Sequence, residues 1–487
     1  MGLWEKTVRF FRKAVPNQTE SAGENRRQRN YDAARPDRLT SGWYAPYGTG
    51  QQTDTAYRAT LRNRARDLER NSDFLNGILL AYERNVVGAG IRLQAKTGEP
   101  ALDSQIETLW SLWCEAEHCD ATGQQGFDEL MSMVLQRKLV DGGVLIHMGA
   151  DSAGVVPLQL QVIEVDALAS AEKPKYAGNR VVDGVEIDGK GRHVGYWIRE
   201  ETFADAFFAK PRFLPAESTI FYWKRTRPTQ VREISNMAPT LTRIASITSY
   251  MESVAEKERI NASFAAVIKT HASPGGVGGR SPTPGASGSS GRGTGGDYEG
   301  KTITPGMIYR LQAGEDIQAI TPPSSGSSAA DYIRLQLRAG AAGQGVSYEA
   351  ASRDLSQTNY SSGRQGAVED KATFDKERRA LIAYVMNRIY REFIRLSIMA
   401  NKLPIGAAAY LKEPTRYERH VWISPSKPWI DPAKEANANK IALETHQKTL
   451  TQIAAENGRD IEELIEELRN EKDLLETITG VKKEDAE

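Results

Sequence analysis

Cys114, His118 and Cys119 form a close group of potential metal ligands. Thiolates and imidazoles bind zinc, but this spacing is not a usual zinc-ligand pattern, and no second ligand pair is evident. The chain has 2 cysteines, which provide no disulfide framework. A reducing cytoplasm is the simplest setting for them. The sequence therefore favours a structural role for this group, on or beside a helix that carries Trp110 and Trp113, and predicts no metal site.

Acidic side chains could support general acid–base or metal chemistry if folding brought them together. Asp141, Glu164 and Asp166 are examples, but with 63 Asp and Glu residues in the chain such a pairing carries no information at this level. The motifs HExxH, GxSxG and CxxC are absent. We therefore expect no catalytic residues, no cofactor and no enzymatic activity.

The most informative stretch is Gly345 to Gly366, GVSYEAASRDLSQTNYSSGRQG, which we call the polar segment. A short helical run at 331–342 precedes it, and a long amphipathic helix at about 365–401 follows it. The segment has hydroxyl, amide and guanidinium groups but no catalytic signature. A polar segment of this kind between two helices is typical of a surface that contacts a ligand without transforming it.

Length and charge limit the possible functions. At 487 residues the chain exceeds one compact core, so several subdomains are expected. Lys+Arg 63 balances Asp+Glu 63, which disfavours a tight static DNA binder, because affinity for DNA comes largely from neutralised phosphates. Neutrality is compatible with DNA that passes through a weakly interacting channel. No apolar run is long enough to predict a transmembrane helix, so no membrane partner is expected.

Hydrophobic periodicity predicts an α+β block at 61–235 that begins with helices. Short strands and tight turns follow, at Val144–Met148, Pro157–Val165, His193–Trp197 and Ser218–Tyr222. A long helix with a coiled-coil-like seam should follow from Met237 to about Phe264. A flexible Gly/Ser/Pro insertion is expected at 272–298 between strands FAAVIKT and MIYRLQ, and an extended polar arm up to residue 60. A strand pair is expected at Ala407–Tyr410 and His420–Ser424. Two C-terminal helices should follow, the first ending at Asn457-Gly458 and the second capped by Asp460.

Four blocks of the chain, in the right order, resemble the lambda-like family of tailed-bacteriophage portal proteins. The polar segment with its NYSSGRQ sequence (Asn359 to Gln365) carries the resemblance most clearly. The other three blocks are RARDLERNSDFLNGILLAYERNVVGAGIRLQ (Arg64 to Gln94), FYWKRTRPTQVREISNMAPTL (Phe221 to Leu241) and TPGMIYRLQAGEDIQAITPP (Thr304 to Pro323). The resemblance as a whole runs from about residue 25 to 430.

The resemblance implies an α+β portal-type fold with long stem helices, an α/β wing, a small clip and a helical C-terminal crown, assembled as a ring. The implied parts are an N-terminal basic and polar arm at 1–60, a wing at 61–235, a first stem helix at 236–265, a clip at 266–322 that contains the 272–298 insertion, a second stem helix at 323–345, a tunnel loop at 346–364, the wing's long helix and strands at 365–430, and a crown at 431–487. The insertion departs from the family pattern and leaves the clip boundaries open.

The resemblance also implies a function and partners. Family members form a ring of twelve subunits at one capsid vertex. Terminase packages double-stranded DNA through this ring, and the DNA is later ejected from it. The implied partners are other copies of the chain, double-stranded DNA, the terminase large subunit, the major capsid protein and scaffold, and head-completion or adaptor proteins. The protein would meet these partners in the host cytoplasm and remain in the virion.

Two sets of residues are candidates for the channel wall. On the polar segment they are Arg353, Gln357, Asn359, Tyr360 and Arg364; alternatively, Asn359 and Tyr360 are buried anchors and Arg364 pairs with a neighbouring subunit. On the first stem helix, Glu252, Glu256 and Glu258 either line the channel and repel phosphate or pair with nearby cations. Two other functions stay open: a capsid-associated scaffold without a channel, and a metal-dependent nucleic-acid enzyme.

Overall fold

The computed structural model describes residues 42, 45–150, 154–171, 173–199, 211–263, 267–270, 315–318, 326–425 and 432–479. The chain divides into two compact units, at 1–48 and 49–487, and the fold described below is that of the second unit. No helix in the described ranges is both long enough and apolar enough to cross a membrane.

The N-terminal helices begin earlier than the sequence suggested. Helix α2 (Gly50–Asn71) starts at a capping box in which Thr49 and Gln52 satisfy each other's backbone N–H groups. Ser72 then separates it from α3 (Asp73–Val86) and accepts a hydrogen bond from the backbone of Leu75. The prediction of an extended arm up to residue 60 is therefore wrong for 50–60. The capping box starts a helix there, and Arg58 on this helix is buried.

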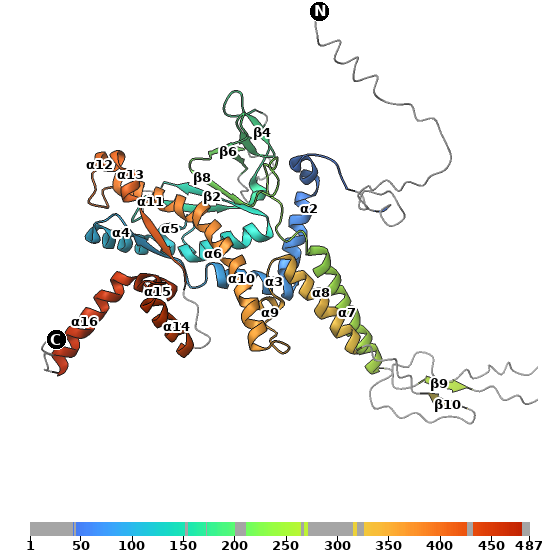
Figure 1. Ribbon diagram of the computed structural model, residues 1–487. Coiled ribbons are helices and arrows are strands. Elements are labelled where there is room, and N and C mark those ends of the chain that lie inside the picture. The colour runs from blue at the N-terminus through green and yellow to red at the C-terminus, as the bar shows by residue number, and fades with distance from the viewer. Residues whose placement is uncertain are drawn as a thin grey trace, which may run out of the picture. The chain divides into compact units, whose positions relative to one another are not determined.

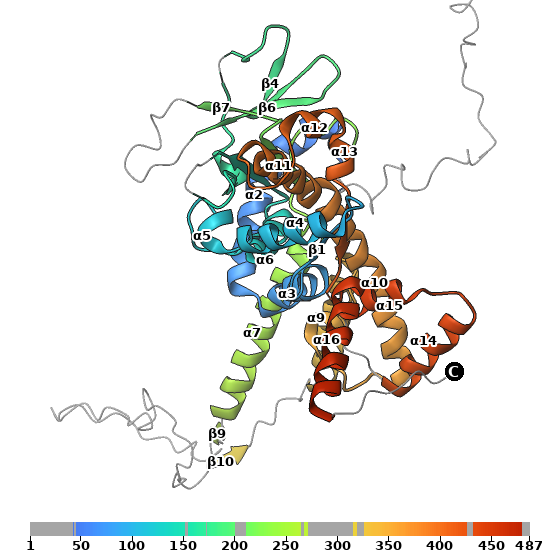
Figure 2. The same ribbon diagram turned by 90° about the vertical axis from the view of Figure 1, so that its left-hand side faces the viewer.

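Three helices and two antiparallel sheets follow in the order expected for an α+β domain. The three-stranded sheet has the strand order β3-β2-β8, and the four-stranded sheet, visible in Figure 2, has the order β4-β5-β6-β7. The predicted strands are confirmed. The elements are α4 (Pro100–Trp113), α5 (Ala116–Cys119), α6 (Phe127–Val140), β2 (Gly143–Gly149), β3 (Gln159–Ile163), η2 (Val165–Ala167), β4 (Arg180–Val182), β5 (Val185–Ile187), β6 (His193–Ile198), β7 (Arg212–Pro215) and β8 (Thr219–Trp223).

An aromatic core joins the first half of the chain to the last third. The ring of Trp110 on α4 lies 5.0–5.7 Å from five other rings, those of Trp113, Phe127, Tyr390, Phe393 and Trp422. Strand β1 (Arg92–Ala95) pairs with β11 (His420–Ile423), more than three hundred residues away in the chain. Helix α10 (Tyr360–Leu381), a π-helical turn η3 (Ile382–Met386) and α11 (Asn387–Met399) supply the remaining apolar face. The long amphipathic helix expected at about 365–401 is confirmed, and its apolar face buries Val385, Met386, Ile389 and Phe393.

Two helices leave this core side by side. Helix α7 (Leu241–Ser263) packs against α8 (Gly326–Gly343), as Figure 1 shows. Gly343 is needed where α8 ends, because a Cβ there would lie 2.7 Å from the methyl group of Thr240. Beyond the helices, β9 (Val267–Thr270) pairs with β10 (Glu315–Gln318). The predicted insertion and the predicted strand MIYRLQ lie outside the described residues.

The C-terminal third departs from two predictions. Ala407–Tyr410 is not a strand but part of helix α12 (Ala407–Lys412), because its alanines favour helix and Gly406 provides the start. The C-terminus has three helices rather than two in its described part. A turn at Thr445–Thr449, where His446 has a left-handed backbone, splits the first of the predicted pair. The elements are α13 (Pro414–Tyr417), α14 (Pro432–Glu444), α15 (Leu450–Glu456) and α16 (Ile461–Thr479).

Candidate nucleic-acid interface

The polar segment is held at its N-terminal end by partly buried hydrogen bonds. Ser347 donates its N–H and its hydroxyl to the two carboxylate oxygens of Asp370, at 2.7 and 2.6 Å. Tyr82 on α3 donates its hydroxyl to the carbonyl oxygen of Gln344 at 2.6 Å. These bonds fix the position at which the chain leaves α8.

Close packing fixes the next part of the segment. Helix α9 (Tyr348–Ser352) begins at Ser347, whose hydroxyl accepts from the N–H of Ala350. It lies so close to α3 that a Cβ on Gly77 would be 2.3 Å from the carbonyl oxygen of Ala351. Any larger residue at position 77 would push the two helices apart. The segment is therefore not one continuous loop, since its first third is a helix packed on the core.

The exposed loop between α9 and α10 is shaped by its own polar groups. Arg353 adopts the left-handed backbone conformation, with φ 58°, that ends α9. Asp354 accepts hydrogen bonds from Ser356, which lower the pKa of its carboxyl, and from the hydroxyl of Tyr348 at 3.1 Å. Asn359 is the N-cap of α10, where its side-chain oxygen accepts from the N–H of Ser362 at 2.8 Å.

The residues predicted for the channel wall are largely exposed. Arg353, Gln357, Asn359 and Arg364 are exposed, whereas the side chain of Tyr360 lies outside the described part. Asn359 shapes the loop through its cap, as one alternative proposed, but it does so from the surface and not from a buried position. In the described part of the chain, the guanidinium groups of Arg353 and Arg364 have no ion-pair partner. The segment therefore exposes two available cations, Arg353 where α9 ends and Arg364 in the first turns of α10.

The predicted acidic residues on α7 do not share one face. Glu252, Glu256 and Glu258 are all exposed. At about 3.6 residues per turn, Glu252 and Glu256 lie on one side of the helix and Glu258 lies nearly opposite Glu256. Glu256 also forms an ion pair with Arg259 at 2.7 Å. At most two of the three acids can therefore face one direction.

The cysteines have the surroundings of structural residues. Cys119 is buried and its thiol donates to the carbonyl oxygens of Cys114 and Gln125, at 3.4 and 3.7 Å. Burial raises the pKa of the Cys119 thiol to about 12 and raises that of Cys114 beyond its ordinary range. Because the thiolate is the metal-binding form, these thiols are poor ligands.

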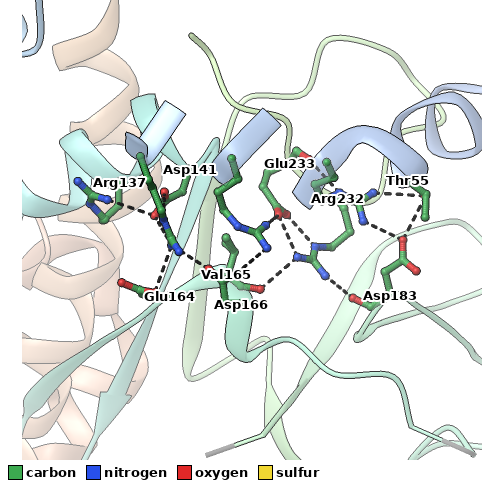
Figure 3. Close-up of polar contacts among 12 residues, drawn as sticks. Thr55, Arg137, Asp141, Glu164, Val165, Asp166, Asp183, Arg232 and Glu233 are labelled. Atoms are coloured by element: carbon green, nitrogen blue, oxygen red, sulfur yellow. Dashed lines mark hydrogen bonds and ion pairs between the residues drawn. The ribbon is translucent and has the colours of Figure 1, made fainter. Parts of the chain in front are cut away.

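The acids named as possible catalytic partners do come together, but around an arginine. The guanidinium of Arg66 on α2 donates to Asp141 at 2.7 and 3.0 Å, to Glu164 at 3.1 Å and to Asp166 at 2.8 Å. Figure 3 shows this cluster and its continuation toward Asp183. The three carboxylates thus share the cation of Arg66, and Arg137 and Arg62 add a second cation to Asp141 and to Asp166. Their geometry is that of a structural ion-pair network, which sequence patterns alone did not reveal.

The same network ties α2 to both sheets. Arg62 pairs with Asp166 at 2.6 Å and with the fully buried Glu233 at 3.4 Å. Arg58 pairs with Asp183, in the turn between β4 and β5, at 2.9 Å. The side chains of Arg58, Arg62 and Glu233 are almost entirely removed from solvent, so these are buried charges that need their partners.

Comparison with known proteins defines the class to which this fold belongs. The chain is 24% identical over 487 residues to the probable portal protein of Halomonas phage phiHAP-1, covering 96% of this chain and 92% of that protein. It is 20% identical over 433 residues to portal protein B of Escherichia phage lambda, covering 82% and 81%. The portal protein of Escherichia phage N15 is 20% identical over 463 residues, covering 87% and 86%.

Residues 36–378 match the family model described as phage portal protein, lambda family. This match spans more than half of the chain, and the chain therefore belongs to the lambda family of phage portal proteins. Among solved structures it is similar to chains from the neck of a native gene transfer agent particle with C12 symmetry, with 14% identity and a TM-score of 0.40 over 86% of this chain and 97% of that one. A chain from the virion of that type of particle has 13% identity and a TM-score of 0.43, covering 84% and 98%.

The family assignment confirms the resemblance seen in the sequence.

Proposed function

We propose that copies of this chain close into a ring of twelve subunits, and that double-stranded DNA passes through the hole during packaging and ejection. Membership of the portal family supports this function. The observation that carries it is the polar segment, an exposed surface with Arg353 and Arg364 available, fixed to the core by the bonds of Ser347 and Tyr82. Ring symmetry would repeat this surface around the hole as a collar.

Weak contacts repeated by symmetry suit this role. Arginine and amide side chains can touch phosphates without reading bases, so the collar would accept any sequence. Each contact is small, but many subunits act together on one duplex. The chain would guide DNA without altering it chemically, and it needs no catalytic residue or cofactor for that purpose.

We assign the parts of the chain by analogy with the family. In this assignment, 1–60 is an N-terminal arm, although its last residues are helical, and 61–235 with 365–430 form the wing. The helices within 236–265 and 323–345 form the stem, 266–322 the clip, 346–364 the tunnel loop and 431–487 the crown. The terminase large subunit and later the head-completion or adaptor proteins would bind the clip. Assembly with the major capsid protein and scaffold would take place in the host cytoplasm, before the ring becomes part of the virion.

Charge reversal on the polar segment tests this proposal. The variant Arg353→Glu with Arg364→Glu should assemble into rings with a central hole, seen by negative-stain imaging, but should block DNA packaging in an in vitro packaging assay. A matched control reverses two exposed lysines elsewhere, Lys402→Glu with Lys412→Glu, and should package normally. Normal packaging by the segment variant, or a wild-type protein that stays monomeric, would contradict the proposal.

A further inference from the structure

A second cationic surface lies away from the polar segment. It is an open groove of about 810 Å³ between β8, the turn that joins β5 to β6, and the continuous α10–η3–α11 helix. No residue of the polar segment lines it. Eight of its lining residues are Lys or Arg and one is Glu, in a chain whose net charge is zero. Positive charge is therefore concentrated here and not spread evenly over the protein.

Five of the eight cations form no ion pair within the described part of the chain. The other three are paired: Lys138, at the floor, with the one acid of the groove, Glu377, Arg192 with Asp188, and Arg391 with Glu418. The exposed side chains of Lys190, Lys224 and Lys376 form no ion pair in that part. Two arginines at the edge, Arg225 and Arg388, donate to backbone carbonyl oxygens, which leaves their charges uncompensated.

The cations of the groove are close enough to act on one another. The pKa of Lys138 is lowered, mainly by burial, and Lys224 and Lys376 add to this effect although Glu377 opposes it. Burial and the nearby Arg225 lower the pKa of His193 to about 4, so this ring is neutral at physiological pH. An anion placed in the mouth of the groove would relieve this mutual repulsion.

The aromatic rings of the groove favour binding of a duplex backbone over binding of unpaired bases. The ring of His193 stacks on that of Trp223, with an interplanar angle of 6°, and on that of Phe221, with an angle of 28°. These three faces are used within the protein, whereas single-stranded nucleic acid needs several free aromatic faces for successive bases. The π-helical turn η3 supplies one exposed ring at the groove, that of Tyr384 (66% exposed), and one ring cannot stack a run of bases. Such turns interrupt α-helices frequently at functional sites.

We propose that this groove binds the phosphate backbone of double-stranded DNA on a surface outside the channel. The proposal rests on the proposed function for the presence of DNA beside the ring. Lysines on flexible side chains around the mouth, such as Lys224 and Lys376, would contact phosphates and release counterions without reading sequence. The groove is thus a second, electrostatic contact between portal and DNA.

Closed circular duplex DNA is the appropriate probe, because a circle has no end to thread through a closed ring. Its binding to purified wild-type rings is measured as a function of salt concentration. Each phosphate contact contributes about −0.9 to the slope of log K against log [salt], so Lys224→Gln with Lys376→Gln should make the slope less steep by about two. The control Lys402→Gln with Lys412→Gln removes the same charge at two other exposed positions and should keep the wild-type slope.

Three outcomes would overturn the proposal. These are a wild-type ring that does not bind circular DNA, a groove variant with the wild-type slope, and a groove variant that loses binding to polyglutamate but keeps binding to DNA. The last result would assign the groove to an acidic protein segment. The Arg353→Glu/Arg364→Glu variant separates this proposal from the proposed function: it should bind circles normally while failing to package. If only the groove proposal is wrong, circular DNA will not bind the groove, but the Arg353→Glu/Arg364→Glu variant will still fail to package DNA.

Discussion

Removing the negative charge of Glu233 should lower the stability of the fold, because this charge is shared by two buried arginines. The side chain of Glu233 is fully buried and accepts hydrogen bonds from Arg232 at 2.7 and 2.9 Å. It also forms an ion pair with Arg62 at 3.4 Å. Glutamine has nearly the same volume as glutamate, so Glu233→Gln keeps the packing and removes the charge. Two buried guanidinium groups would then lack their shared counterion.

The expected magnitude follows from what those arginines retain. Breaking a buried ion pair by changing one partner typically costs about 3–5 kcal/mol. Arg62 would keep Asp166 at 2.6 Å, and Arg232 would keep the carbonyl oxygens of Asp183 and Val165. We therefore expect the lower end, about 3 kcal/mol of unfolding free energy. Urea unfolding followed by tryptophan fluorescence measures it as a shift of the midpoint at constant slope.

An exposed carboxylate provides the control for this experiment. Glu256→Gln also removes one acid paired with one arginine, Arg259, but at the surface of α7. Such a pair is worth at most about 1 kcal/mol, because water screens both charges. If Glu233→Gln destabilised the protein no more than this control, the buried network would not be what holds α2 to the sheets, and the reasoning would be refuted.

Two further predictions concern a helix cap and a titrating acid. Asn359→Ala removes the hydrogen bond to the N–H of Ser362, so amides in the first turn of α10 should exchange hydrogen roughly fivefold faster, equivalent to about 1 kcal/mol. The control Asn359→Asp keeps an acceptor at the cap and should not change the rate. Equal exchange rates in all three proteins would contradict a stabilising role of the cap. Burial, aided by Asp460 and other acids, raises the pKa of Glu107 to about 7, so the folded state holds this proton more tightly than the unfolded one. Stability should then fall as pH rises from the ordinary glutamate pKa through 7, by about 1 kcal/mol after allowing for solvent screening of this half-buried group. Glu107→Gln should abolish this part of the dependence in urea unfolding at pH 5 and 8, and a persisting difference would count against the assignment.

Sequence patterns predicted the turns and helix faces that are determined by residues close together in the chain. Tight turns were expected among the short strands, and one lies at Asp183-Gly184, where both residues have the positive φ angles, 47° and 86°, that a two-residue hairpin turn requires. The apolar stripe of α10 to α11 was visible because Val385, Met386 and Ile389 recur at helical spacing and bury the same face. Each of these features depends on neighbours within a few residues in the chain.

Features that depend on distant residues could not be predicted in this way. Ala407–Tyr410 is a short apolar run that fits a strand or a helix equally well. The expected partner of the His420–Ser424 strand was this run, but β11 pairs with β1 instead. The cluster around Arg66 needs α2, α6 and η2 to converge, and no spacing in the sequence encodes that meeting. Family resemblance supplied the global assignment that these local patterns lacked.

The internal bonding of the polar segment bears on how a portal could hold DNA without stopping it. Asp354 and Asn359 satisfy backbone N–H groups of the loop itself, so the loop is ordered before any ligand arrives. The exposed guanidinium groups of Arg353 and Arg364 can then meet phosphates with little further loss of conformational entropy. Each such contact is weak in water and breaks without unfolding the loop. A collar of many contacts of this kind would keep a duplex centred while leaving only small barriers to its sliding.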